Sequence, residues 1–142
     1  MLKLRKSLVG HALENHLEQV FREHAITNSR GKMTENRAKP DFIFPGIIHY
    51  HDPGFPAVRL SMLGVKSTCK DRWRQVLSEA RRVDNKHLFT LEPGISENQT
   101  AEMAENKLTL VLPKSLHDSY KPGQKAGLME LNDFISLARG RQ

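Results

Sequence analysis

The chain of 142 residues is long enough to bury one hydrophobic core and too short for two comfortable ones, so we expect a single domain over residues 1–142. Its formal net charge of +6 favours a polyanionic partner such as nucleic acid, although solvated charge on a protein that binds nothing gives the same composition. One cysteine, no signal-peptide core and no apolar run near the ~18 residues of a membrane helix exclude an intrachain disulfide and a membrane span, and predict a soluble cytoplasmic protein.

The first predicted element is an amphipathic helix over residues 7–24. Its apolar residues recur at helical spacing and form one buried stripe, made of Leu13, Leu17, Val20 and Phe21. Glu14 and Glu18 lie one turn apart on another face. They belong either to a solvated face or, as the alternative, to the edge of a metal site.

Residues 27–39 are almost free of apolar side chains and are expected to form an exposed loop. The short strand at 41–44 follows, and Pro45-Gly46 ends it. Asp41 therefore stands at the rim of a buried strand, where a carboxylate is well placed for chemistry. The common alternative for such an aspartate is a helix or turn cap.

The next segment, His-Tyr-His-Asp at 49–52, is expected in a loop flanked by proline and glycine. The spacing of its two histidines suggests zinc, but no cysteine or further histidine at ligand spacing completes a zinc set. A polar loop near bound DNA is the favoured interpretation.

The longest predicted strand covers residues 57–66 and delivers Lys66 at its end. Thr68 and Asp71 have the spacing of a capping box, which predicts that an α-helix follows. Its apolar stripe comprises Cys69, Trp73, Val76, Leu77, Ala80 and Val83, with Glu79 at the edge. Residues 66–86 hold seven basic side chains against three acidic ones, which predicts a focused basic patch.

The remaining pattern predicts a strand at 86–91, a helix at 97–105 capped by Ser96 with Gln99, a strand at 108–112, an exposed loop at 114–127 and a helix at 128–138. The order is α–β–β–α–β–α–β–α. It predicts an α/β fold in which a mixed sheet is flanked by helices on both faces.

Ordered motifs along the chain give this pattern a family resemblance. They are ALENHLEQVF, KPDFIFPG, YHDPGFP, KDRWRQVL, KHLFTLEPGISENQ and NDFISL, between about Ser7 and Leu137. Together with Pro40-Asp41 and Lys66, they resemble the catalytic domain of EcoRII-type type II restriction endonucleases, a branch of the PD-(D/E)XK nucleases. The resemblance implies a restriction-endonuclease-like fold and a place in a restriction-modification system.

The resemblance also implies a set of active-site residues. The general superfamily pattern has an acid two residues before the lysine, where this chain has Gly64; in this branch the acid lies on the following helix, at Glu79. Asp41 and Glu79 are then implied as Mg²⁺ ligands and Lys66 as the catalytic lysine. Lys70 is implied as a second lysine at the site, and Tyr50 as a residue near the scissile phosphate.

Enzymes of this branch cut double-stranded DNA at CC(A/T)GG. The resemblance places Asp71, Arg72 and Arg74 where base and phosphate contacts are expected, and the guanidinium fork of Arg72 suits guanine O6 and N7. Asp71 has the alternative of only capping its helix. Almost nothing precedes Ser7, whereas family members carry more sequence there, so we expect either a minimal nuclease or a truncated remnant.

The leading hypothesis is a Mg²⁺-dependent, sequence-specific DNA endonuclease that acts as a homodimer, because a near-palindromic site needs two active sites. One alternative is a catalytically degenerate DNA-binding module of the same fold, and another is a DNA-repair or junction nuclease. At residue level, Lys66 has the alternative of a solvent-facing strand lysine. Glu79 has the alternative of an ion pair with Arg72 or Arg82.

Overall fold

A mixed five-stranded sheet forms the centre of the computed structural model, which describes the backbone of residues 2–142 and the side chains from residue 8 onward. The strands are β1 (Ser29–Arg30), β2 (Phe42–Phe44), β3 (Ser61–Lys66), β4 (Lys86–Thr90) and β5 (Leu108–Val111), adjacent in that order. The pairs β1–β2 and β2–β3 are antiparallel, whereas the pairs β3–β4 and β4–β5 are parallel. The parallel strands are joined by crossovers that carry helical segments.

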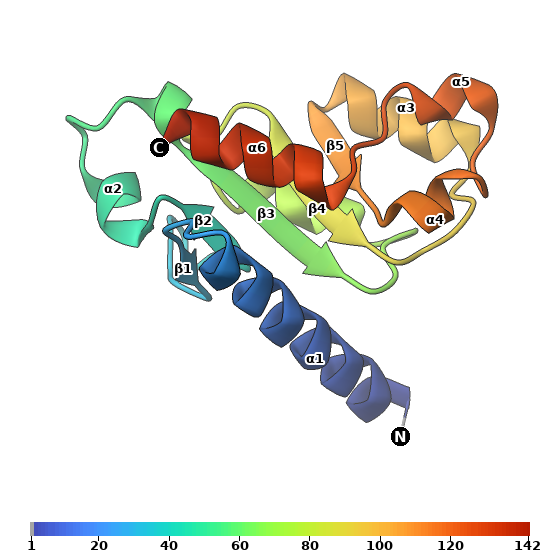
Figure 1. Cartoon of the computed structure of the whole chain (residues 1–142), viewed down its shortest axis with the longest axis horizontal. Coiled ribbons are helices and arrows are strands. Elements are labelled where there is room, and N and C mark those ends of the chain that lie inside the picture. The colour runs from blue at the N-terminus through green and yellow to red at the C-terminus, as the bar shows by residue number, and fades with distance from the viewer. Residues whose placement is uncertain (1) are drawn as a thin grey trace.

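Helices cover both faces of this sheet (Figure 1). The longer ones are α1 (Leu2–Glu23), α3 (Glu97–Glu105) and α6 (Leu131–Arg141). Short helical segments are α2 (Ile47–His51), η1 (Ala57–Arg59), η2 (Trp73–Ser78), α4 (Lys114–His117) and α5 (Pro122–Lys125). The expected α/β fold, a mixed sheet flanked on both faces, is confirmed. Among the described residues, no helix is long and apolar enough to cross a membrane.

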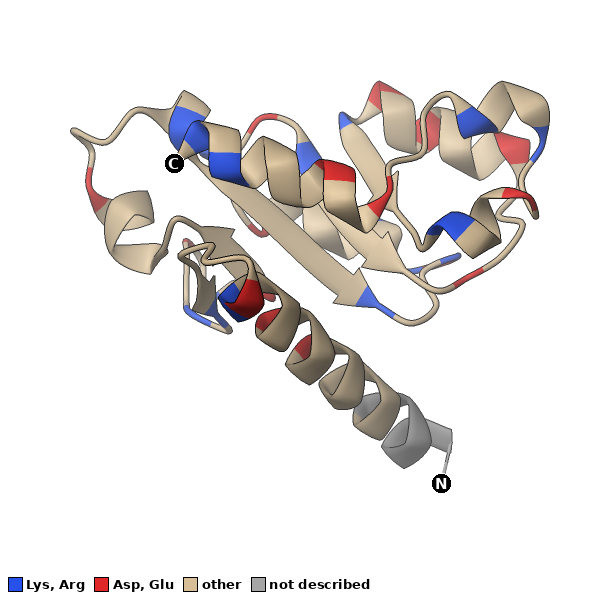
Figure 2. Ribbon diagram, viewed as in Figure 1, with Lys and Arg blue, Asp and Glu red and all other residues tan. Residues whose placement is uncertain are grey.

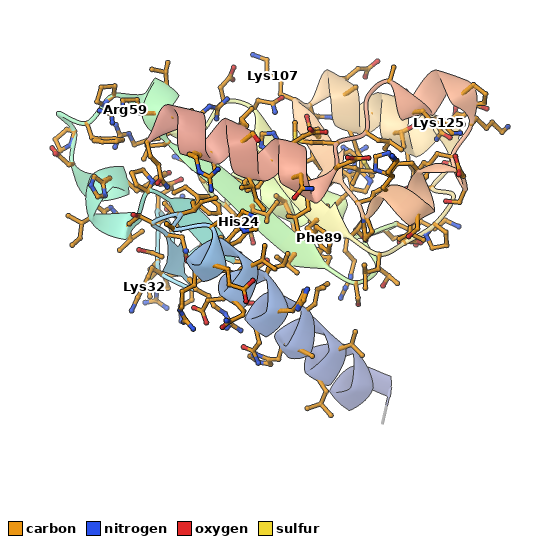
Figure 3. The ribbon with its side chains drawn as sticks, in the orientation of Figure 1. His24, Lys32, Arg59, Phe89, Lys107 and Lys125 are labelled. Carbon is orange, nitrogen blue, oxygen red and sulfur yellow. The ribbon has the colours of Figure 1, made fainter. Side chains whose placement is uncertain are left out.

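The two faces of the sheet bury separate hydrophobic clusters. Under α1 and α6 the cluster contains Leu17, Phe21, Phe42, Phe44 and Phe134, all fully buried. Phe89 in β4, labelled in Figure 3, belongs to it as well. The opposite cluster is formed mainly by η2, α3 and the sheet, and includes Met62, Trp73, Val76, Leu88 and Met103. Alternate residues of each strand therefore serve different layers, as the pleat requires.

Strand β3 lies between β2 and β4 and is buried along its length except at Lys66. It begins at Ser61 and not at residue 57, because residues 57–59 form the 3₁₀ turn η1. The strand is therefore buried on both faces, as its apolar run predicted, and Lys66 lies at its C-terminal end.

The α-helix predicted after Lys66 is wrong. Residues 73–78 form a 3₁₀ helix, and no side chain caps it at Arg72. The amides of Cys69 and Lys70 instead donate to the Glu92 carboxylate, at 2.7 and 2.9 Å, so this acid from after β4 takes the place expected for Thr68 and Asp71. The predicted apolar stripe is buried all the same, since Cys69, Trp73, Val76, Ala80 and Val83 all lie in the core.

Loop predictions were less accurate than strand predictions. Residues 27–39 contribute the short strand β1, the segment around residues 49–51 belongs to α2, and residues 114–127 form α4 and α5. Ser96 does cap α3, accepting a hydrogen bond from the Gln99 amide at 3.3 Å. Each missed element has at most five residues, which is too short for a periodic pattern to be recognised.

Candidate active site

Asp41 lies immediately before β2, beside the end of β3. Its Oδ2 accepts a hydrogen bond from the Val65 amide at 2.7 Å, so the carboxylate is fixed to the neighbouring strand and caps no helix. Burial raises the pKa of Asp41 to about 6, the Val65 hydrogen bond opposes that rise, and the negative charge of Glu14 adds to it. The Asp41 carboxylate is therefore held beside the C-terminal end of β3.

Glu79 follows η2 and turns its carboxylate toward the same place. Burial raises the pKa of Glu79 to about 7, and repulsion from Asp41 contributes to the rise. The alternative of an ion pair with Arg72 or Arg82 is not observed: Arg72 donates to the Thr68 carbonyl at 3.1 Å, and Arg82 donates to backbone carbonyls of residues 49–55.

Lys66, the last residue of β3, completes the group. Its positive charge opposes the rise in pKa of both Asp41 and Glu79, so the ammonium lies within electrostatic reach of the two carboxylates. The side chain is half-buried, which does not fit a lysine that simply reaches into solvent. The structure brings Asp41, Lys66 and Glu79 together from three separate segments.

Gly64 gives a steric reason for the position of the second acid. A Cβ at this residue would lie 3.2 Å from both Val76 Cγ2 and Leu88 Cδ1, tighter than ordinary van der Waals contact. Gly64 and Lys66 point to the η2 side of β3, as alternate residues of a strand do. Because Val76 fills the space beside Gly64, an acid on that face has to come from another segment, and Glu79, the residue directly after η2, supplies it.

The donor chemistry of this group fits a divalent cation. Two neighbouring carboxylates with raised pKa values repel one another in a partly buried place, and a cation between them would relieve that repulsion. Mg²⁺ in proteins is commonly held by one or two carboxylates and keeps several waters. Within the described part of the chain, no group of three or more His, Cys, Asp or Glu residues is placed to hold a metal.

Arg30 in β1 is a charged neighbour that the sequence did not reveal. Its guanidinium pairs with Glu14 at 3.4 Å and with Glu18 at 3.3 Å. In Figure 2, acidic positions (red) lie along α1, and basic positions (blue) lie near β1. Arg30 also opposes the rise in pKa of Asp41. The two glutamates are therefore not purely solvated, and Glu14 stands next to the site as an ion-paired carboxylate.

The predicted DNA-contacting residues Asp71 and Arg72 are exposed, as is Lys70. Arg74 is exposed too, but its guanidinium stacks 4.4 Å above the Trp73 ring and bonds to Glu102. A phosphate or base would have to compete with Glu102 for this arginine. Lys70 uses its backbone amide to bind Glu92 and extends its side chain from the turn after β3.

The basic patch predicted over residues 66–86 is smaller than its composition suggests. Arg82 is half-buried and donates to carbonyls of the α2 segment. Lys86 is 8 % exposed, and its Nζ donates to the Val83 carbonyl at 2.7 Å. These two cations stabilise the fold and are directed inward, so they do not contribute to a DNA-facing surface.

Tyr50 is buried in α2, with its hydroxyl donating to the Glu35 carboxylate at 2.7 and 2.8 Å. Among the described residues, no hydrogen bond connects that hydroxyl to the acid–lysine–acid group. Its expected place near the scissile phosphate stays a prediction. Nearby, His51 bonds to the Met33 carbonyl and His49 stacks edge-on against Phe55, so the two histidines do not converge as zinc ligands would.

The mixed five-stranded sheet with helices on both faces is a restriction-endonuclease-like fold. Structural comparison supports the fold: Ecl18kI, solved as metal-depleted complexes with uncleaved DNA and with uncleaved, modified DNA, superposes with a TM-score of 0.82 in both cases. Sequence identity is 20 % and 19 %, and the match covers 99 % of this chain and 47 % of Ecl18kI.

The sequence comparisons identify the family. The model of the EcoRII C-terminal domain matches residues 1–135, and the chain therefore belongs to the EcoRII C-terminal family. The type II restriction enzyme EcoRII of Escherichia coli is 48 % identical over 137 residues, which is 96 % of this chain. The chain spans 34 % of the length of that enzyme, and the resemblance expected from its motifs is confirmed.

Proposed function

We propose that residues 1–142 form the catalytic domain of a Mg²⁺-dependent type II restriction endonuclease that hydrolyses phosphodiester bonds in double-stranded DNA. The observation that carries the proposal is the electrostatic proximity of Asp41, Lys66 and Glu79 near the C-terminal end of β3. Its support is the effect of Asp41 on the pKa of Glu79 and the opposing effect of Lys66 on the pKa of both carboxylates. The 48 % identity to a type II restriction enzyme supports the reaction class.

In this proposal Asp41 and Glu79 hold the metal ion. Mg²⁺ bound there supplies Lewis-acid stabilisation of the phosphate and orients a water. The Val65 amide holds the Asp41 carboxylate in place, so only Glu79 has to adjust when a cation enters. Repulsion between the two acids, which destabilises the metal-free site, becomes attraction for the cation.

Lys66 acts on the reacting group. Its ammonium, close to both carboxylates, would stabilise the negative charge that develops on the phosphate in the transition state. Lys70 is proposed as a second cation at the same phosphate, since its side chain extends from the turn directly after β3. Arg30 limits the negative charge around Asp41 by pairing with Glu14 and Glu18.

For the DNA, we propose that Arg72 reads a base edge and that Asp71 and Arg74 lie at the same surface, at a CC(A/T)GG-like site. Among the residues that the structure describes, the exposed Arg72 side chain has one hydrogen-bond partner, the Thr68 carbonyl, so its fork can be redirected to guanine. Ecl18kI, a solved structural neighbour, was itself captured on DNA. A homodimer is proposed because the two strands of such a site need two active sites.

The test is cleavage of plasmid DNA by the purified chain with and without Mg²⁺, followed by sequencing of the ends. We expect Glu79→Ala to abolish cleavage at ordinary Mg²⁺, with residual activity that rises at higher Mg²⁺. Lys66→Ala should abolish cleavage without any rescue by Mg²⁺, because the lost group does not hold the ion. Wild-type protein that binds DNA and never cuts with Mg²⁺ or Mn²⁺ would point instead to a catalytically degenerate DNA-binding module.

A further inference from the structure

A partly buried network of hydrogen bonds holds the backbone at and after Glu79. Thr34 Oγ1 donates to the Glu79 carbonyl at 2.6 Å, which ties the backbone of the candidate ligand to the loop between β1 and β2. Thr34 is 8 % exposed, so this bond is shielded from water. The same loop ends at Asp41, and the Gly31 amide donates to the Asp41 carbonyl at 3.1 Å. One loop therefore contacts the backbone of both carboxylate residues.

Glu35, the next residue of that loop, holds the chain just after Glu79. Its Oε1 accepts a hydrogen bond from the Arg81 amide at 2.6 Å. The Tyr50 hydroxyl donates to the Glu35 carboxylate and also accepts from the Arg82 amide at 3.3 Å. The carbonyl of residue 79 and the amides of residues 81 and 82 are thus all bound by side chains from outside their own segment.

This segment needs such support because it has little regular structure of its own. The 3₁₀ helix η2 ends at Ser78, and Glu79 is its first residue beyond the end. A carboxylate on an irregular turn is directed only as well as its backbone is fixed. Repulsion between Glu79 and Asp41 would otherwise turn the carboxylate outward before a cation arrives.

We infer that Thr34, Glu35 and Tyr50 are positioning residues, which hold the backbone at Glu79 so that its carboxylate faces Asp41 in the metal-free protein. The inference rests on the proposed metal site and deepens it. It gives Tyr50 a role through Glu35 and not at the phosphate. Outer contacts of this kind typically change metal affinity by 10–100-fold when they are removed.

The first experiment compares two substitutions of Thr34 in the full chain. Thr34→Val keeps the shape and removes the hydroxyl that binds the Glu79 carbonyl, whereas Thr34→Ser keeps the hydroxyl. Mn²⁺ binding measured by calorimetry, without DNA, should weaken about tenfold in Thr34→Val and stay within about twofold of wild type in Thr34→Ser. Equal Mn²⁺ affinity in the two variants would overturn the inference.

The second experiment uses a matched pair of buried tyrosines. Tyr50→Phe removes the hydroxyl from the network, and Tyr120→Phe removes one that donates to the Glu92 carbonyl at 2.6 Å, away from residues 79–82. Both variants should lose thermal stability, but only Tyr50→Phe should weaken Mn²⁺ binding. With DNA present, Tyr50→Phe should need more Mg²⁺ for half-maximal cleavage while its rate at saturating Mg²⁺ stays near wild type.

Three results separate this inference from the proposed function. Wild-type protein that binds no Mn²⁺ would overturn both the metal site and the positioning role. Wild-type protein that binds Mn²⁺ with the same affinity as Thr34→Val and Tyr50→Phe would overturn only the positioning role. A loss of cleavage rate in Tyr50→Phe that saturating Mg²⁺ does not restore would also overturn it, because the hydroxyl would then act at the reacting phosphate.

Discussion

At the scale of single residues, the site is built from groups that destabilise one another until a cation joins them. Asp41 and Glu79 both have pKa values raised by burial, and a neighbouring carboxylate adds to each rise, Glu14 at Asp41 and Asp41 at Glu79. Structural ion pairs elsewhere, such as Lys125–Asp118, instead lie at the exposed surface and join opposite charges. The contrast is typical of a functional site, where interactions serve binding more than stability.

The first prediction concerns Glu79→Gln and the stability of the metal-free protein. The folded pKa of Glu79, about 7, lies above its value of 4.5 in the unfolded chain, so the folded state binds more protons between these pH values. Stability from this group is therefore lost as the pH rises from about 4.5 to 7. At pH 8, Glu79→Gln should have an unfolding free energy about 1–2 kcal/mol above that of wild type, after allowance for solvent screening. Near pH 4 the two proteins should be equally stable.

Chemical denaturation in EDTA at several pH values measures this effect. Glu105→Gln, a change of an exposed glutamate at the end of α3, is the control and should leave stability nearly unchanged at every pH. A Glu79→Gln protein less stable than wild type at pH 8 would show that the carboxylate makes a stabilising contact and is not strained by Asp41.

The second prediction separates base reading from phosphate binding. Arg72→Ala should reduce discrimination between the cognate site and single-base variants by about 1–3 kcal/mol, the usual contribution of one bidentate base contact. Arg74→Ala should weaken binding to all sequences alike and only slightly, because any phosphate contact of Arg74 competes with its bond to Glu102 and its stacking on Trp73. Binding to a panel of duplexes in Ca²⁺ measures both; equal losses on every duplex for Arg72→Ala would remove it from specificity.

At the scale of elements, the turn between β3 and β4 decides the geometry of the site. The Glu92 carboxylate accepts hydrogen bonds from the amides of Cys69 and Lys70. The segment from β3 to β4 is therefore fixed just after Lys66. It then runs through η2, packs Val76 against Gly64 and reaches Glu79. The acid and the lysine are therefore positioned by the same close contact between η2 and β3.

The third prediction tests that contact. Gly64→Ala places a methyl group 3.2 Å from Val76 Cγ2 and Leu88 Cδ1, and should cost about 1–3 kcal/mol of unfolding free energy through overpacking. Gly140→Ala, in α6, meets no atom within 4 Å and should gain about 0.5–1 kcal/mol, since alanine favours a helix. Thermal unfolding of both variants gives the comparison. Stabilisation by both would show that η2 does not pack tightly on β3.

How far the sequence determined these elements follows from what each pattern depends on. Helix α3 agrees with its predicted limits, because the signal that predicts it, the Ser96 cap with Gln99, is local to the segment. The 3₁₀ helix η2 was predicted as an α-helix, because the apolar spacing of residues 69–83 suits either form. What decides between them is Glu92, a residue more than twenty positions away, whose contact with Cys69 no local pattern contains.

The site was predictable to a similar degree. Asp41, Lys66 and Glu79 were identified through a family resemblance; Asp41 and Lys66 both act on the pKa of Glu79, and the catalytic roles of the three residues stay predictions. Thr34, Glu35 and Arg30 were not found, because they lie in a polar stretch that reads as loop and act only through contacts with distant residues. The signal for them is three-dimensional, in the buried hydrogen bonds of residues 34 and 35.

At the scale of the whole molecule, the net charge overstates the number of basic side chains that are available to DNA. The net charge is +6, but several basic side chains are already engaged within the fold or in surface ion pairs. Arg82 and Lys86 bind backbone carbonyls, and Lys107 pairs with Asp84 at 3.1 Å. Affinity for DNA will therefore depend on which cations face the phosphates, and counting basic residues along the sequence overstates it.

The last prediction measures this difference with two lysines of the same segment. Lys70 is exposed next to the site, whereas Lys86 is buried with its ammonium on the Val83 carbonyl. Each phosphate contact releases counterions and contributes about −0.9 to the slope of log K against log salt. Lys70→Met should make the slope shallower by about one, and Lys86→Met should leave it unchanged, although both remove one positive charge. Binding to a duplex without Mg²⁺, from about 50 to 200 mM salt, gives the slopes. A slope that becomes shallower in Lys86→Met would mean that net charge governs the affinity; one that changes only in Lys70→Met would locate the DNA beside the end of β3, where Asp41, Lys66 and Glu79 meet.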